Sequence, residues 1–168
     1  MMDTNPFRNP NAKPTWAQLT RLAGDRVAIL FEELRSLMGR VDGLIEELHY
    51  TGPEAGWAPS YRVGEEKLFW VSILPGSLVG HMEIDQSLLR KTLASRVGVP
   101  LKKALHEAQP LAEERSLFHL ELTSAKLVRA FARLAVRSAD LRSPRRQVRA
   151  SLRSDSSEKY CRLEVAHG

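Results

Sequence analysis

Three short strands in succession are predicted between Gly56 and Glu83, and they constrain the fold more than any other part of the chain. Side chains alternate between two faces in the first and third segments, the second is apolar on both faces, and turn sequences around Gly64 and Gly76 separate them. Because strands joined by such short turns pair antiparallel, the sequence predicts an antiparallel sheet. The predicted strands are residues 57–63, 67–74 and 78–85.

Two further strands and five helices are predicted around this segment. Residues 44–50 fit either an irregular strand or one helical turn, and we predict a strand. Residues 116–123 alternate between apolar and polar side chains, which is typical of a strand with one wet face. The predicted helices, marked by apolar residues at helical spacing, are residues 15–23, 25–39 and 124–137, one that follows Asp85 and one between Pro100 and Pro110. The predicted N-caps are Thr15, which forms a capping box with Gln18, and Asp25, Asp85 and Ser124.

The order of these elements predicts an α+β fold, with an antiparallel sheet of four to five strands and helices packed on one face. A chain of 168 residues is long enough for one such domain with a core of its own. We predict a disordered N-terminal arm over residues 1–14, a single domain over residues 15–138 and a basic low-complexity tail over residues 139–168.

Positive charge is distributed unevenly along the chain. The net charge is +5, and residues 137–168 hold eight Arg or Lys against four Asp or Glu, whereas residues 1–136 hold seventeen against sixteen. The nearly neutral domain therefore gives no indication of nucleic-acid binding. We interpret the basic tail first as a solubilising terminus, and the alternative is that it contacts nucleic acid or an acidic surface. Its clustered arginines are Arg142, Arg145, Arg146, Arg149 and Arg153.

Short motifs in the strand region resemble those of a known family. Gly56-Trp57 is followed by Tyr61-Arg62, then by the segment 67–70 and by a Pro75-Gly76 turn. This pattern resembles the bacterial domain-of-unknown-function 3788 family and, more broadly, YdhG-like α+β domains, over residues 15–138. The resemblance implies the layered α+β arrangement and no agreed activity. Some YdhG-like relatives are similar to iron chaperones, and the Arg-rich tail does not belong to the family pattern.

Three predicted strands carry a His and a Glu two residues apart, so both side chains of a pair point to the same side. Neighbouring strands lie about 4.8 Å apart, and two pairs on adjacent strands therefore predict a site for iron, zinc or manganese. The alternative is that these side chains form the wet face of the sheet. The pairs are Glu47 and His49, His81 and Glu83, and His119 and Glu121.

Aromatic residues of the strands predict a second kind of site. Trp57, Tyr61 and Trp70, joined by His81, are predicted to line a pocket in which ring N–H and O–H groups orient a small ligand. The alternative is that the three aromatic rings pack in the core. Trp57 and Tyr61 share one face of their strand, and the register of the sheet decides whether Trp70 joins them.

The sequence contains no catalytic motif. There is no Gly-x-Ser-x-Gly and no Gly-rich phosphate loop, and the single cysteine, Cys161, has no histidine motif near it. We therefore predict a non-enzymatic protein that binds a small ligand or a partner at its sheet. The alternatives are metal binding or delivery by the His/Glu pairs, and an enzyme whose site no motif reveals.

The cellular location is predicted from what the sequence lacks. The N-terminus has no apolar segment like that of a signal peptide. No apolar run approaches the roughly 20 residues of a membrane helix. We therefore expect a cytoplasmic protein.

Overall fold

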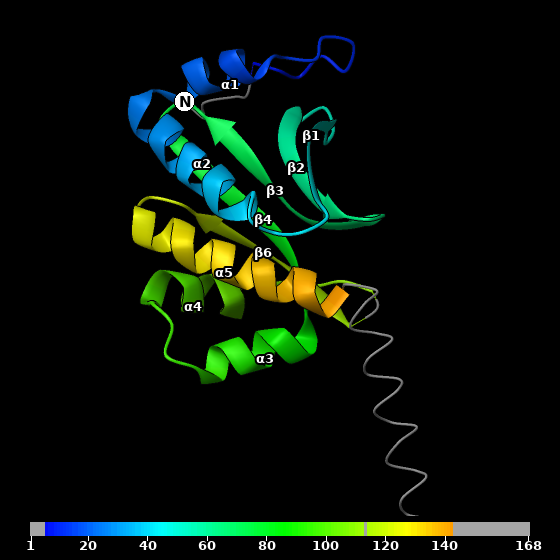
Figure 1. Ribbon diagram of the computed structural model, residues 1–168, viewed down its shortest axis with the longest axis vertical. Helices are drawn as coiled ribbons and strands as arrows, with labels where there is room; N and C mark the ends of the chain where they lie inside the picture. The colour runs from blue at the N-terminus through cyan, green and yellow to red at the C-terminus, as the bar shows by residue number, and fades with distance from the viewer. Residues whose placement is uncertain (1–5, 113, 143–168) are drawn as a thin grey trace, which may run out of the picture.

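The fold is built on one antiparallel sheet of six strands in the order β1-β2-β3-β4-β6-β5 (Figure 1). This computed structural model describes residues 6–112 and 114–142, and structural statements below concern those residues. The predicted α+β class with an antiparallel sheet is confirmed. The strands are β1 (Leu44–Tyr50), β2 (Trp57–Val63), β3 (Glu66–Leu74), β4 (Ser77–Asp85), β5 (Gln109–Pro110) and β6 (Arg115–Glu121).

The sixth strand, β5, is not among the predicted strands. It is two residues long and pairs with β6 at one edge of the sheet. The sequence pattern marks Pro110 only as the end of a helix. Proline is tolerated on an edge strand because no neighbour needs its missing N–H, and a two-residue strand has no periodicity to detect.

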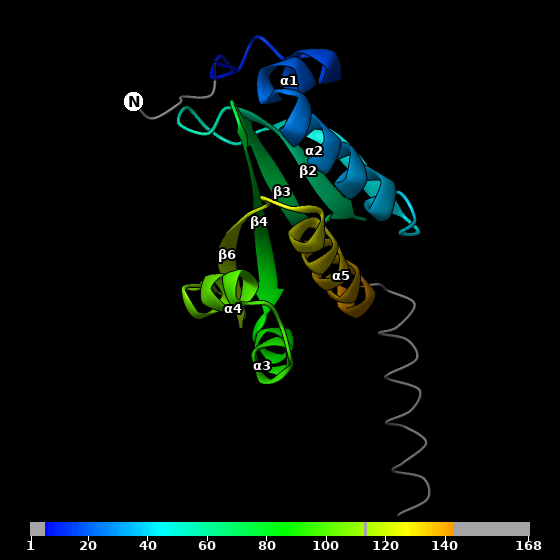
Figure 2. The ribbon, with the colours of Figure 1, turned by 90° about the vertical axis from the view of Figure 1, so that its left-hand side faces the viewer.

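Within residues 6–112 and 114–142, five helices lie on one face of the sheet. Figures 1 and 2 show α2 and α5 side by side across this face, with α3 and α4 beyond α5. The opposite face carries no helix among the described residues, and we call it the open face. The helices are α1 (Trp16–Ala23), α2 (Asp25–Met38), α3 (Gln86–Ala94), α4 (Val99–His106) and α5 (Ala125–Arg142). None of these helices is long and apolar enough to cross a membrane.

The core lies between this helical layer and the sheet. The Phe69 ring stacks on Tyr61 at a centroid distance of 4.3 Å and meets the edge of Phe131 from α5 at 5.3 Å. Gly80 of β4 leaves the space that the Phe131 ring occupies, because a Cβ at position 80 would lie 2.6 Å from that ring. Phe118 of β6 contacts the same ring at 6.2 Å. Phe131 therefore joins three strands to α5.

Some of the predicted helix caps are observed in the structure and one is not. The capping box of Thr15 and Gln18 is confirmed, and Gly39 is the C-cap of α2. The predicted cap at Asp25 is wrong, because Gly24, with a φ of 80°, is the N-cap and Asp25 is the first helical residue. Gly24 takes that position because the tight turn between α1 and α2 needs a positive φ, which glycine adopts without strain.

Asp85 occupies the predicted N-cap position of α3, but its side chain makes no capping hydrogen bond. Its carboxylate lies instead 3.9 Å from Arg115 and 3.6 Å from Arg142. The carboxylate predicted to cap α3 therefore lies near two guanidinium groups, and Asp85 Oδ2 and Arg142 Nε are buried without a hydrogen-bond partner.

The final helix continues past its predicted end at Arg137 to Arg142, so the start of the predicted tail is helical. Arg142 is 5% exposed and donates to the backbone carbonyls of Lys67 at 2.8 Å and Glu83 at 2.9 Å. β3 and β4 pair only as far as Phe69 and Met82 at this end, so Arg142 binds carbonyls of two strands that have separated. We call this contact the Arg142 clasp. Arg142 is thus not available to an acidic partner.

The N-terminal segment contacts the sheet. The backbone N–H and the indole N–H of Trp57 donate to the carbonyls of Phe7 and Asn9, at 3.0 and 2.9 Å. The Tyr50 hydroxyl donates to the carbonyl of Arg8. Part of the segment predicted as a disordered arm is therefore hydrogen bonded to β1 and β2. The predictions for residues 1–5, for Arg145, Arg146, Arg149 and Arg153, and for Cys161 lie outside the described residues.

We expect Gly80→Ala to destabilise the fold by about 1–3 kcal/mol, because its Cβ overlaps the Phe131 ring. Urea unfolding measures the change. In a Phe131→Leu background the same substitution should cost less, since the ring is gone. Gly98→Ala, whose Cβ would meet its nearest atom at 3.9 Å, is the matched control. Equal losses at positions 80 and 98 would contradict the proposed contact.

We expect Arg142→Met to destabilise the protein by about 1–3 kcal/mol, because two half-buried carbonyls lose their donor. Arg137→Met, on the exposed side of the same helix, should change the free energy of unfolding by about 0.5 kcal/mol or less. Chemical denaturation of both variants provides the comparison. A loss of the same size in each would show that helix composition, not the clasp, is responsible.

Candidate functional site

The open face brings together three of the residues singled out from the sequence. Trp70 on β3 pairs with His81 on β4, and His81 pairs with His119 on β6. The Trp70 and His81 rings stack with centroids 5.1 Å apart, and the His119 ring meets the edge of His81 at 4.8 Å. The three rings therefore form one row across three neighbouring strands.

Hydrogen bonds link this row to a serine that the sequence patterns do not single out. Ser72 Oγ lies 2.8 Å from His81 Nε2, and His81 Nδ1 lies 2.6 Å from His119 Nδ1. Ser72 is two residues from Trp70 on the same strand, so it points to the same face. The pairing of β3 with β4 brings Ser72 to His81, and only the register reveals that contact.

His81 is held in its neutral form. Burial, and then the nearby His119 and Lys67, lower the pKa of His81 from 6.5 to about 4. Enzymes activate a serine nucleophile by hydrogen bonding its hydroxyl to an imidazole, which in turn is hydrogen bonded to a third group. A base with a pKa of about 4 is weak at neutral pH, since general bases work best when their pKa is near the working pH. The row therefore satisfies the hydrogen bonds of a half-buried imidazole and gives little activation to Ser72.

The six predicted metal ligands do not converge. Glu83 lies 3.8 Å from Arg115, and Glu121 accepts a hydrogen bond from Ser77. Among the described residues, no three His, Cys, Asp or Glu side chains are grouped so that they could hold a metal ion. Only the two histidines His81 and His119 meet.

The third predicted pair, Glu47 and His49, lies on β1, three strands from β4. At about 4.8 Å per strand this is roughly 14 Å from His81. Glu47 is also paired with Arg62 at 3.1 Å. The pair is therefore too distant to contribute to one site with the other two.

The four predicted ligand-binding residues lie on two faces. Trp70 and His81 are on the open face, whereas Tyr61 stacks on Phe69 beneath the helices and is 1% exposed. Trp57 shares the helix-covered face with Tyr61, four residues away, and packs with Tyr50. The four side chains therefore do not line one pocket.

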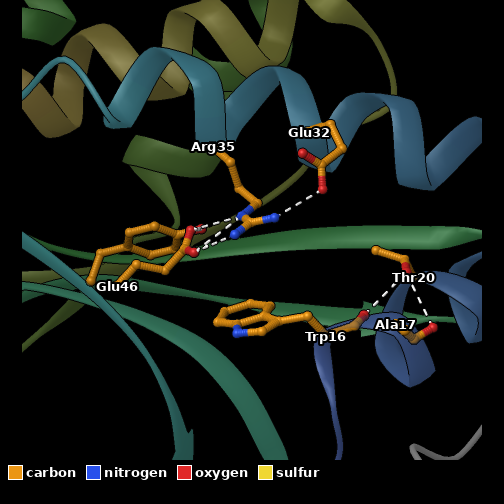
Figure 3. A network of polar contacts seen from close by, with 7 residues as sticks. Trp16, Ala17, Thr20, Glu32, Arg35 and Glu46 are labelled. Carbon is orange, nitrogen blue, oxygen red and sulfur yellow. Dashed lines mark hydrogen bonds and ion pairs between the residues drawn. The ribbon is translucent and has the colours of Figure 1, made fainter.

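A second cluster lies between α2 and the first two strands. Figure 3 shows the guanidinium of Arg35 between the carboxylates of Glu32 and Glu46, above the ring of Trp16. The Tyr61 hydroxyl donates to Glu46 at 2.9 Å. The hydrogen bond from Arg35 to Glu46 is the largest cause that raises the pKa of Arg35, and burial followed by Glu46 raises the pKa of Tyr61.

A cavity of about 450 Å³ adjoins this cluster. The polar groups at its centre already bind one another, since Glu46 accepts from both Arg35 and Tyr61. Because these contacts join α2 to β1 and β2, we interpret the cluster as part of what holds the helical layer on the sheet.

A third feature, which no sequence motif indicates, is a cavity of about 480 Å³ between α5 and the segment that runs from the end of α3 to the start of α4, which we call the cationic groove. Four exposed cations line it, none of them with an ion-pair partner among the described residues, and no Asp or Glu lines it. The cations are Arg96, Lys126, Arg133 and Arg137.

Arginines outside the groove are of two kinds: Arg8, Arg21, Arg40 and Arg90 are exposed and, like those of the groove, have no ion-pair partner among the described residues, whereas others are paired. Arg35, Arg62, Arg115 and Arg129 each have a carboxylate within 3.1 Å. The sequence signal for the groove was weak, because its cations come from a loop and from separate turns of α5 in a nearly neutral domain.

Comparison of the chain with protein-family models, with curated proteins and with solved structures finds no match in any of the three. The resemblance to the domain-of-unknown-function 3788 family therefore stays a prediction.

We expect acid to destabilise the wild-type protein through His81. The unfolded chain takes up a proton near pH 6.5 and the folded protein near pH 4, so stability is lost as the pH falls through this interval. Between pH 7.5 and pH 5 the loss attributable to His81 is about 2 kcal/mol. Urea unfolding of wild type and His81→Gln at both pH values measures it.

His49→Gln, at an exposed histidine of β1, is the matched control and should retain the wild-type pH dependence. The explanation fails if His81→Gln loses as much stability as the wild type between the two pH values.

Proposed function

We propose that this protein is a non-enzymatic binding protein that holds a small anionic ligand in the cationic groove. The observation that supports the proposal is the set of four exposed cations around one cavity. No carboxylate lines the cavity, and none of the four cations forms an ion pair with another described residue. The open face and the Arg35 cluster instead contain polar groups that are already bound to one another.

Electrostatics favours an anion at this place. Arg133 and Arg137 are four residues apart and lie on the same side of α5, so their like charges repel. Cations gathered in a groove with apolar walls also raise the local concentration of anions. An anionic ligand removes the repulsion and gains from both effects.

The chemistry of the cations narrows the class of ligand. Three of the four are arginines, whose planar guanidinium groups bind carboxylate or phosphate with two parallel hydrogen bonds. A cavity of about 480 Å³ is within the usual range for small-molecule sites. We therefore propose a carboxylate or phosphate compound of small size as the ligand.

The test is titration calorimetry with inorganic pyrophosphate as the probe. Wild type should bind it, more weakly as salt is added, and Arg133→Gln/Arg137→Gln should bind at least about tenfold more weakly because two charged hydrogen bonds are lost. Arg21→Gln/Arg40→Gln removes two exposed arginines outside the groove and should retain affinity within about twofold.

Thermal unfolding of each variant confirms that it is folded. Absence of binding to the wild type, or equal weakening in the two double variants, would refute the proposal, since either result denies the groove a specific role.

A further inference from the structure

The floor of the cationic groove is aliphatic. Leu101 and Leu134 are 3% and 2% exposed and belong to the core. Val97, Leu127 and Ala130 are half-buried and pack against it. All five line the groove, and no aromatic side chain does.

The two uncharged polar side chains of the groove have their protons engaged. Thr92 Oγ1 donates to the carbonyl of Leu88 at 2.7 Å, and Ser95 Oγ donates to the carbonyl of Thr92 at 2.7 Å. The side-chain donors left in the groove are therefore the four cations. A polar ligand body placed on the floor would lose hydrogen bonds to water without replacement, which disfavours sugars and bases there.

α5 arranges charge and apolar surface along its length. Lys126 and Arg137 lie eleven residues apart, which is about 16 Å along a helix. Leu127, Ala130 and Leu134 follow at intervals of three and four residues and so form a stripe between the charged positions. The groove thus offers charge around an apolar strip.

We infer that the ligand is amphipathic, with a single alkyl or acyl chain on the aliphatic floor and a phosphate or carboxylate head group at the cations. This inference rests on the function proposed above, because it takes the cationic groove as the binding site. A single-stranded nucleic acid fits less well, since its bases stack on aromatic rings and the groove lining has none.

Alkyl phosphates of increasing length test the chain. Octyl, decyl and dodecyl phosphate, each below the concentration at which it forms micelles, are compared with inorganic phosphate by titration calorimetry. We expect Kd to fall about fourfold for each added methylene, the gain for transferring that group from water to an apolar site. Octyl glucoside, which has the chain without the charge, should bind at least about tenfold more weakly than octyl phosphate.

A floor variant separates the chain from the head group. Ala130→Gln places a polar side chain on the strip and should reduce the gain per methylene while phosphate still binds. Ala125→Gln, at a half-buried alanine that begins α5 and does not line the groove, is the matched control and should retain the full gain.

The outcomes distinguish this inference from the proposed function. Phosphate or pyrophosphate binding with no dependence on chain length overturns the inference and leaves the proposed function standing. Failure of every anion to bind overturns both, and equal affinity for octyl glucoside overturns the charged head group. Binding only to vesicles of phosphatidylcholine and phosphatidic acid, with none to monomeric alkyl phosphate, overturns the single-chain ligand in favour of a membrane surface.

Discussion

The contact between Phe131 and Gly80 determines the arrangement of the layers. The ring of Phe131 occupies the space that a side chain at position 80 would need, so α5 lies close against β4. Phe69 and Phe118, on the strands to either side, meet the same ring. With this side of α5 fixed on the sheet, another side of the helix faces the segment that joins α3 to α4, and the cationic groove forms there. The packing of α5 in the core therefore determines where the cations of the groove lie.

Much of the fold could be predicted because local patterns and the final structure agree. The strands from Trp57 to Asp85 alternate or are flanked by glycine turns, and these signals need no knowledge of distant residues. The two elements that the sequence did not predict, the last turn of α5 and the strand β5, depend on contacts with distant residues. The last turn of α5 is stabilised by buried Ala139 and Arg142, although its local sequence reads as a polar tail. β5 exists only because β6 is beside it.

The candidate sites were harder to predict because they depend on register and packing. That His81 meets His119 while Glu83 turns to Arg115 follows from pairings between strands about forty residues apart, which periodicity cannot supply. The cationic groove depends on which arginines remain unpaired. Arg129 and Arg133 are one turn apart on α5, yet the first is bound to Glu33 and the second lines the groove. Sequence composition cannot distinguish the paired arginine from the unpaired one.

The Arg142 clasp has a mechanical consequence. Its guanidinium binds one carbonyl on β3 and another on β4, on the last residue before the chain leaves the described part of the protein. A load applied at this residue therefore acts on β3 and β4 directly, near the centre of the six-stranded sheet, as well as along α5. The C-terminal end of α5 is thus joined to the sheet, so that a tensile force at this end is divided between the helix and the two strands.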